Sequence, residues 1–419
     1  IYIKTKYFHF FPISFIYILY YYQIVNIVIL TFSGIPTLDY CLPFIKNLKR
    51  EKNINEVYLL SNALNSKSIF TENDDTINTI SLMDIKNVDL STYSIFQRIK
   101  SLFIFSLRDL HRSNIFIKFI KKLERLIIKK SNLTVRALKK INPDIIFFDH
   151  RPPKSIENYS KIFEYLLKNN ISIYLTPHAP HYLETGEHLS TMLDHESLGK
   201  ITYLEPFKQS GLPKEIINLY KDVQYTSYPG LEKNWLSNFN ETCKYKDSLV
   251  VMLRPFHTDF SKWSKDEKVV LRQQEITEII ECVNLIAKKN DYKNIILKPH
   301  PKNYSHDLEK YVIPFLDHKN IILYKDSIYN LISISNDFIS TYSTTALISI
   351  ANGSKTFIVN SEIFSRIFED WDTLKNLYSN FSGFTTSKDI ADIEIDPVQD
   401  QEHLRKFFDS TKYNYLNFL

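Results

Sequence analysis

The stretch IILYKDSIYNLISISNDFISTYSTTALISIANGSKTFIV, residues 321–359, decides the fold that we expect. Short apolar runs alternate in it with segments of helical spacing, at 321–324, 326–335, 337–340, 344–352 and 356–359. Short apolar runs separated by helices are typical of βαβ units, whose strands lie parallel in one sheet. The stretch therefore predicts successive strands of a parallel α/β sheet.

The same alternation continues outward from this stretch through most of the chain. The further expected strands are 25–31, 57–60, the end of 141–150, 171–176, 248–253 and 294–298, and the further expected helices are 38–49, 155–169, 266–289 and 305–316. Residues 225–247 interrupt the series with turn formers and charge. We therefore expect two doubly wound, Rossmann-like domains, residues 25–235 and 236–419, facing each other across a cleft.

Residues 1–24 form a hydrophobic extension before the first expected strand. The run FHFFPISFIYILYYYQIVNIVIL, residues 8–30, has no formally charged side chain and is long enough to cross a bilayer. Pro12 and Gln23 interrupt the run, and no small-residue cleavage site of a secretory signal follows it. The extension is either a membrane anchor or an artefact such as translated upstream sequence, and both interpretations stay open.

The composition excludes several classes of protein. The chain has 419 residues, 44% hydrophobic and 24% charged, which is ordinary for a folded protein of more than one domain. The net charge of +5 is too small for a dedicated nucleic-acid-binding protein. Cys41, Cys243 and Cys282 are widely separated and form no C-x-x-C pair, so neither a disulfide framework nor a zinc site is indicated. We expect a cytoplasmic location.

Glycine is scarce, with seven residues in the whole chain. No two of them have the spacing of a G-x-G-x-x-G turn or of a Walker-type loop, so a glycine-rich phosphate loop is excluded. A phosphate group must therefore be held by other means. Gly353 has a structural explanation, since it follows the expected helix 344–352 at the position where glycine adopts the left-handed conformation.

A proline-flanked histidine follows the expected strand 294–298. Lys298, Pro299, His300 and Pro301 read K-P-H-P. The two prolines fix the backbone on either side of one imidazole, which would hold His300 where a phosphate oxygen or a leaving group can accept its hydrogen bond. The alternative is a stiff turn with a solvated histidine.

A cluster of hydroxyl groups follows the expected strand 337–340. The cluster STYSTT begins the next expected helix, and its candidate phosphate-binding residues are Ser340, Ser343, Thr344 and Thr345. Hydroxyls and the unpaired N–H groups of a first helical turn can converge on an anion without any glycine. The alternative is an ordinary Ser/Thr helix cap.

Together these two segments resemble those of bacterial surface-polysaccharide transferases with the GT-B fold, namely the CDP-glycerol glycerophosphotransferases and the capsule sialyltransferases. Residues 298–301 match their K-P-H-P-like segment, and 339–344 (ISTYST) match their I-T-D-Y-S-S-like segment. The resemblance implies that His300, Ser343 and Thr344 bind the phosphate of a nucleotide-activated donor, and that the N-terminal domain supplies the catalytic base. Thr341 stands where the phosphotransferases usually have Asp, and Ile348 where many GT-B enzymes have Glu.

A loop rich in titratable groups follows the expected strand 171–176. The loop TPHAPHYLETGE, residues 176–187, contains His178, His181, Glu184 and Glu187. A histidine or carboxylate there could remove the proton of an acceptor hydroxyl, with His178 the first candidate and Glu187 the second. The spacing does not match H-E-x-x-H, so we assign no metal, and a plain polar loop is the alternative.

Several smaller groups also follow expected strands. Arg254, after strand 248–253, could bind a diphosphate through its planar fork or pair with a surface carboxylate. Candidates on the acceptor side are Ser33, Gly34, Thr37, Asp149, His150 and His181. The basic segment 118–140 could lie against anionic lipid, or it could be a solvated helix on the sheet.

The expected function is that of a transferase moving a sugar or polyol phosphate from a nucleotide-activated donor, CMP- or CDP-linked, to a polysaccharide or lipid-linked acceptor. We expect no cofactor, no nucleic-acid partner, and peripheral contact with the inner face of the cytoplasmic membrane. A nucleotide-sugar 2-epimerase and a non-catalytic scaffold protein are the alternatives, and the departures at Thr341 and Ile348 keep the scaffold open.

Overall fold

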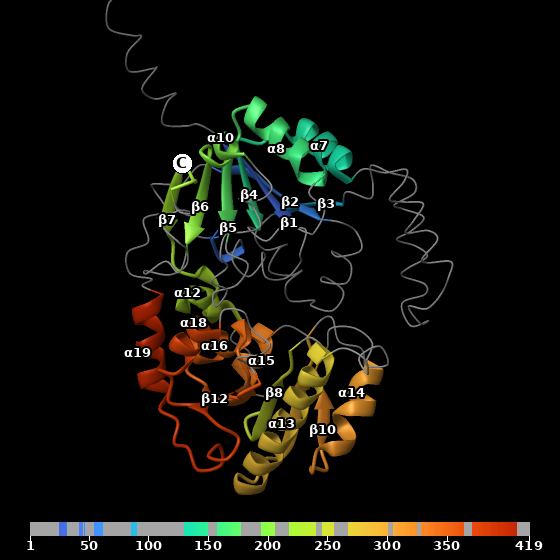
Figure 1. The fold of residues 1–419 in the computed structure, drawn as a ribbon, viewed down its shortest axis with the longest axis vertical. Coiled ribbons are helices and arrows are strands. Elements are labelled where there is room, and N and C mark those ends of the chain that lie inside the picture. Colours follow the sequence, from blue (N-terminus) through green and yellow to red (C-terminus); the bar gives the residue numbers. More distant parts are fainter. Residues whose placement is uncertain are drawn as a thin grey trace, which may run out of the picture.

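The computed structural model contains two parallel β-sheets joined by a linker of short helices (Figure 1). It describes residues 25–31, 42–44, 46, 54–61, 85–89, 130–149, 157–176, 194–205, 218–239, 245–254, 267–300, 305–324, 328–363 and 371–408.

The first sheet has the strand order β3-β2-β1-β4-β5-β6-β7, and every neighbouring pair is parallel. Its strands are β1 (Val25–Thr31), β2 (Ile54–Ser61), β3 (Ile85–Asp89), β4 (Ile145–Asp149), β5 (Ser172–Thr176), β6 (Ile201–Glu205) and β7 (Asp222–Tyr225). The order reverses between β1 and β4. This reversal is a topological switch point, where ligands of doubly wound sheets bind.

The second sheet repeats the same plan with the order β10-β9-β8-β11-β12-β13, again fully parallel. Its strands are β8 (Ser248–Met252), β9 (Asn294–Lys298), β10 (Ile321–Leu323), β11 (Asp337–Ser340), β12 (Lys355–Val359) and β13 (Phe384–Thr385). The switch point here lies between β8 and β11. Both orders confirm the expected doubly wound α/β fold.

Helices cover both faces of the second sheet, and their apolar residues divide between two clusters. Those on one face are α13 (Glu267–Lys289) and α14 (Ser305–Tyr311), and those on the other are α15 (Ile328–Ile334), α16 (Thr344–Ala351), α18 (Trp371–Tyr378) and α19 (Pro397–Phe407). A short 3-10 turn, η5 (Ile313–Phe315), follows α14. Successive residues of β11 alternate between the clusters, with Phe338 toward the α16 side and Ile339 toward the α13 side.

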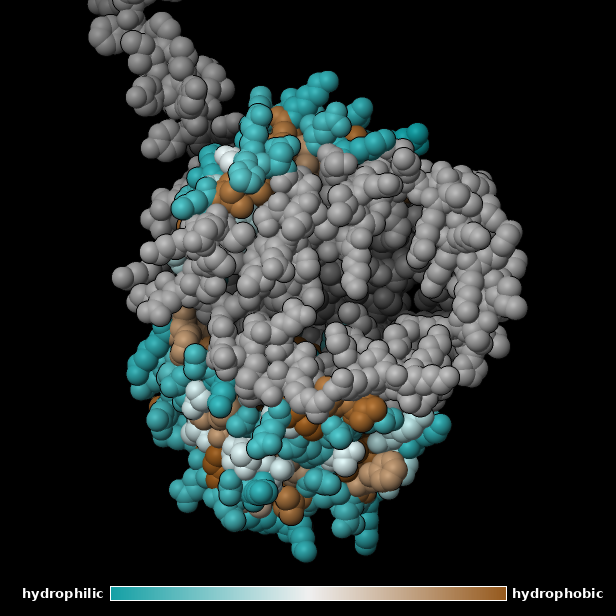
Figure 2. Space-filling view, in the orientation of Figure 1, coloured by the Kyte–Doolittle hydropathy of each residue, from teal (hydrophilic) through white to brown (hydrophobic). Residues whose placement is uncertain are grey.

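The first sheet packs in the same alternating way. Val28 and Leu30 of β1 pack toward α7 (Lys130–Ile141) and α8 (Glu157–Lys168), while Ile27 and Ile29 face the opposite side. Helix α10 (His195–Leu198) lies at the same end of the molecule as α7 and α8 (Figure 1). Hydrophilic side chains dominate the outer surface over these helices and at the far end over the second sheet (Figure 2).

The linker between β7 and β8 contains η2 (Pro229–Leu231), α12 (Lys233–Leu236) and η3 (Ser237–Phe239). Trp235 and Phe239 of the linker pack against each other and against Tyr329 of α15, with ring centroids 4.8 to 5.9 Å apart. From the first domain, Lys46 binds Asn238 and lies 5.8 Å from the Trp235 ring. One cluster of buried apolar residues therefore includes members of both sheets and of the linker.

Most expected elements of the C-terminal half lie within about two residues of their expected bounds, although α14 ends at Tyr311 instead of 316, and some elements were not predicted. The 344–352 helix is α16, and Gly353 follows it with φ +84°, which confirms its left-handed conformation. The sequence reading did not name β3, β6, β7, α18, β13 or α19. The 1–24 extension and residues 118–129 of the basic segment lie outside the described residues, whereas residues 130–140 belong to α7, which buries Ala137 and Leu138 against the first sheet. Within the part that the structure describes, no helix is both long and apolar enough to span a bilayer.

Candidate functional site

The two motifs of the C-terminal half leave the second sheet from one row of residues. Met252, the last residue of β8, pairs with Lys298 on one side and with Ser340 on the other. Since neighbouring strands are about 4.8 Å apart, the backbones of Lys298 and Ser340 lie about 10 Å from each other. The K-P-H-P and S-T-Y-S-T-T segments thus begin side by side at the carboxyl edge, around the switch point.

Arg254 stands between these two segments. It lies two residues beyond Met252, and the N–H of Leu253 donates to the carbonyl of Lys298 at 3.0 Å, which keeps this part of the chain alongside β9. The guanidinium of Arg254 pairs with the carboxylate of Glu275, with Nη1 and Oε1 3.4 Å apart. The Arg254 side chain is 16% exposed and that of Glu275 only 2%. Arg254 does pair with a carboxylate, but with a buried one rather than a surface one.

Glu275 also accepts a hydrogen bond from the hydroxyl of Thr341, 3.4 Å from the same Oε1 atom. Thr341 is fully buried. Glu275 was not among the residues predicted from the sequence, although a pattern in α13 could have revealed it. Leu271, Glu275 and Ile279 are four residues apart along the helix and all are buried, so the carboxylate occupies an apolar stripe.

Ser343 begins helix α16 as its cap. Its backbone is extended, with φ −153° and ψ 146°, and its Oγ accepts a hydrogen bond from the N–H of Thr345 at 3.3 Å. The hydroxyls of Ser343 and Thr345 lie 2.8 Å apart. Ser343 is therefore a helix cap at the start of a helix that follows a switch-point strand, and phosphate binding by the cluster stays a prediction. A helix start carries a partial positive charge that favours anions.

Tyr378 holds this helix start, and the neighbouring Tyr342 is hydrogen-bonded to the segment after β12. The Tyr378 hydroxyl donates to the Ser343 carbonyl at 3.0 Å, and the Tyr342 hydroxyl donates to Asn360 Oδ1 at 3.1 Å. Burial raises the pKa of both phenols, and the nearby positive charge of Arg254 partly offsets this rise for the pKa of Tyr378. Both side chains therefore stay neutral donors at physiological pH.

The other predicted residues of this site differ in their exposure. Lys298 and His300 are half-buried, as are Thr344 and Thr345. Ser340 is 0% exposed, and its hydroxyl makes no hydrogen bond to any residue that the structure describes. Ile348 is also fully buried, within the core cluster of α16, so this position faces the protein interior.

The acceptor-side and catalytic-base candidates lie mostly outside the described residues. These are Ser33, Gly34, Thr37, His150, His178, His181, Glu184 and Glu187. Asp149 ends β4, and only its backbone is described. The strands that these residues follow are neighbours in the first sheet, since β1 pairs with β4 and β4 with β5. Within the described ranges, no group of three or more His, Cys, Asp or Glu side chains could hold a metal ion.

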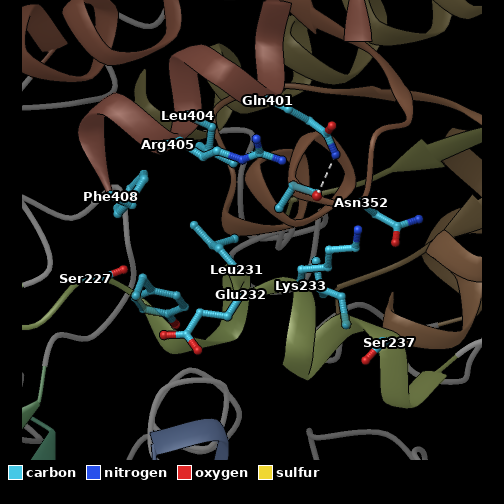
Figure 3. A pocket seen from close by; sticks show the side chains of 13 residues that line it. Ser227, Leu231, Glu232, Lys233, Ser237, Asn352, Gln401, Leu404, Arg405 and Phe408 are labelled. Carbon is cyan, nitrogen blue, oxygen red and sulfur yellow. Dashed lines mark hydrogen bonds between the residues drawn. The ribbon is translucent and has the colours of Figure 1, made fainter. Parts of the chain in front are cut away.

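A cavity of about 340 Å³ lies elsewhere, between the linker and the helices α16 and α19 (Figure 3). It is lined by Ser227, Tyr228, Leu231, Glu232, Lys233, Leu236, Ser237, Ala351, Asn352, Gln401, Leu404, Arg405 and Phe408. Ala351 and Asn352 end helix α16, whereas Ser343 caps its start. The cavity therefore contains none of the predicted site residues and is separate from the switch point.

Comparison with solved structures gives the class of fold. A candidate UDP-N-acetylglucosamine 2-epimerase from Listeria monocytogenes aligns with a TM-score of 0.50 and 11% identity, over 94% of this chain and 93% of that chain. The S. aureus MnaA–UDP structure aligns with a TM-score of 0.49 and 10% identity over 94% of both chains. A glycosyltransferase from Rickettsia africae aligns with a TM-score of 0.43 and 12% identity, over 95% of this chain and 97% of that chain. No protein-family model and no curated protein matches the sequence.

At such low identity the similarity establishes the fold alone. The chain has the GT-B fold, with two Rossmann-like sheets of matching strand order. Its described candidate site lies at the switch point of the second sheet, where Arg254 is flanked by the K-P-H-P segment and by the capped start of α16.

Proposed function

We propose that this protein is a nucleotide-sugar enzyme of the GT-B class. The observation that carries the proposal is the place of Arg254 at the switch point, between Lys298 and Ser343. A cation, a half-buried histidine and a helix start around one point form a favourable environment for a phosphate or diphosphate group. Doubly wound sheets bind their ligands at such points.

The favoured reaction is the transfer of a sugar or a polyol phosphate to a cell-surface polysaccharide or glycolipid. In this scheme Lys298, His300 and the start of α16 offset the negative charge of the departing nucleotide phosphate. A base in the first domain, provisionally His178 with Glu187 second, removes the proton of the acceptor hydroxyl. The resemblance of the K-P-H-P and I-S-T-Y-S-T segments favours a CMP- or CDP-linked donor. No metal or cofactor takes part in the scheme.

An epimerase is the second candidate, because the Listeria protein with the same fold is named as a candidate UDP-N-acetylglucosamine 2-epimerase. The two reactions differ in what they need. An epimerase acts on the nucleotide sugar without an acceptor, whereas a transferase releases the nucleotide only when an acceptor is present.

Calorimetry followed by product analysis tests these proposals. CMP, CDP and UDP are titrated into the full chain, and binding of at least one of them supports a nucleotide-sugar enzyme. Nucleotide sugars of the base that binds are then incubated with and without a lipid-linked oligosaccharide acceptor. Conversion without acceptor identifies the epimerase. No nucleotide binding at millimolar concentration would favour the scaffold interpretation instead.

A further inference from the structure

We infer that Glu275 is a positioning residue, which fixes the guanidinium of Arg254 at the phosphate-binding point. The inference rests on the proposed function, and it adds a residue from helix α13 to a site otherwise made by strand ends. Glu275 itself lies too deep to contact a ligand, since its side chain is 2% exposed. It therefore acts through Arg254.

Arg254 is held both at its backbone and at its guanidinium group. Its backbone follows Leu253, whose N–H donates to the carbonyl of Lys298 at 3.0 Å. Its guanidinium is held by Glu275 at 3.4 Å from Nη1. A guanidinium is planar and carries five donors, so an ion pair at one nitrogen fixes the direction of the others.

The carboxylate is itself oriented by Thr341. The Thr341 hydroxyl donates to the same Oε1 atom, and Thr341 directly follows β11 in the switch-point segment. Glu275 thereby joins two neighbouring strand ends, that of β8 through Arg254 and that of β11 through Thr341. Movement of either strand end would alter the direction in which Arg254 points.

Packing alone does not explain a carboxylate at this position. Leu271 and Ile279 occupy the same stripe of α13, so a leucine at 275 would continue it. Burying a carboxylate costs free energy that its ion pair offsets only in part, and apolar replacements of buried pairs are often more stable. A gain in function would account for keeping the charge there.

Removal of the charge distinguishes positioning from simple neutralisation. If Glu275 only offset the charge of Arg254, Glu275→Gln would leave a stronger positive field and a nucleotide diphosphate would bind more tightly. If Glu275 directs the guanidinium, the same variant would bind more weakly. The two roles thus predict changes of opposite sign in the dissociation constant.

The experiment is calorimetric titration of CMP, CDP and UDP into the full chain and its variants. Glu275→Gln is expected to weaken binding about tenfold, the size expected for one misdirected hydrogen bond to a charged group. Thr341→Val, which removes a hydroxyl without changing charge, is expected to weaken it about threefold. The matched control is Asp392→Asn, which breaks the exposed pair between Asp392 and Lys289 at the other end of α13 and should leave affinity unchanged.

A double-mutant cycle separates positioning from general damage to the fold. In an Arg254→Lys background there is no guanidinium fork to direct, so adding Glu275→Gln should change the affinity by less than about twofold. Equal weakening in both backgrounds would overturn the inference, as would unchanged or tighter binding by Glu275→Gln alone. If Glu275→Gln does not fold, Thr341→Val is measured in the Arg254 and Arg254→Lys backgrounds instead. Weakening of binding in the Arg254 background alone then supports the inference, and equal weakening in both overturns it. If the unsubstituted chain binds none of CMP, CDP and UDP, the proposed function fails and the inference falls with it, whereas a chain that binds one of them without the expected effect of Glu275→Gln overturns the inference alone.

Discussion

Tyr378 donates its phenolic hydrogen bond to the carbonyl oxygen of Ser343, 3.0 Å away, and thereby supports the residue that caps helix α16. Tyr378 belongs to α18 and is fully buried, and its ring meets that of Tyr342 edge to face at 4.9 Å. The start of α16 is thus anchored to another helix. Its position does not depend on the preceding loop alone.

Tyr378→Phe should lower the free energy of unfolding by about 1 kcal/mol, because the buried hydrogen bond is lost while the ring is kept. The measurement is urea denaturation followed by circular dichroism. Tyr165→Phe is the matched control, since within the described residues Tyr165 takes part in hydrogen bonds through its backbone carbonyl and not its hydroxyl, and its cost should stay below about 0.5 kcal/mol. Equal losses in both variants would contradict the anchoring role of Tyr378.

Stability should fall at alkaline pH. Burial raises the pKa of Tyr220 to about 12, from an ordinary value of 10.0, and it also raises the pKa of Tyr342 and Tyr378. As pH rises, the unfolded chain therefore loses these protons before the folded protein does. The stability that the protonated tyrosines contribute is complete below about pH 10, and it declines as pH rises toward the pKa values of the folded state.

Urea midpoints measured from about pH 8 to about pH 11 check this expectation. Tyr220→Phe keeps the stacked contact with Tyr203, whose ring centroid is 5.6 Å away, but removes one titrating group. The decline of this variant should be shallower than that of the unsubstituted protein. A flat profile for the unsubstituted protein would contradict the raised pKa values.

Gly383→Ala should destabilise the second sheet strongly. A Cβ atom at Gly383 would lie 1.9 Å from the carbonyl oxygen of Thr356, and neither backbone can shift freely, because the Gly383 carbonyl accepts from Ile358 at 2.8 Å. We expect a loss of about 3 kcal/mol or more in urea denaturation. Gly199→Ala is the control, since its Cβ would meet its first neighbour at 3.4 Å and its φ is −63°. Similar stability of the two variants would contradict this expectation, because it would mean that the backbone at Gly383 shifts to make room for the Cβ atom.

His300→Ala should abolish transfer while leaving the fold intact. His300 is half-buried beyond the end of β9 and lies outside the sheet ladder, so its loss should leave the circular dichroism spectrum and the urea midpoint nearly unchanged. Turnover is measured with the nucleotide sugar identified by calorimetry, beside the exposed-surface control His195→Ala. Near-full turnover by His300→Ala would remove His300 from the mechanism.

The elements of 321–359 could be predicted from the sequence because β11 and β12 are mostly buried inside the sheet and the partly exposed edge strand β10 is apolar throughout. Such strands read as continuous apolar runs, and the hydroxyls and glycine between them mark the helix ends. The expected helix 344–352 therefore differs from α16 by one residue at its end. By contrast, β7 reads DVQY, with two polar residues among four and exposed ends, so it lacked this pattern.

The partners of the site residues could not be predicted, because they come from distant parts of the chain. Thr341 and Glu275 are separated by 66 residues, and their contact depends on α13 packing beside the end of β11. The sequence indicated that Arg254 follows a strand, but not which carboxylate it would meet. Strand order decides such contacts, and local patterns do not contain it.

The core cluster that joins the two sheets bears on whether the halves could be exchanged as modules. It combines Phe147 of the first sheet, Trp235 of the linker and Phe338 of the second sheet in one set of contacts. Cutting the chain between residues 235 and 236 would divide α12 and expose these apolar surfaces in each fragment. Grafting either half onto an unrelated partner would therefore require redesign of the linker core, and homologous halves should be swapped only together with residues 226–239.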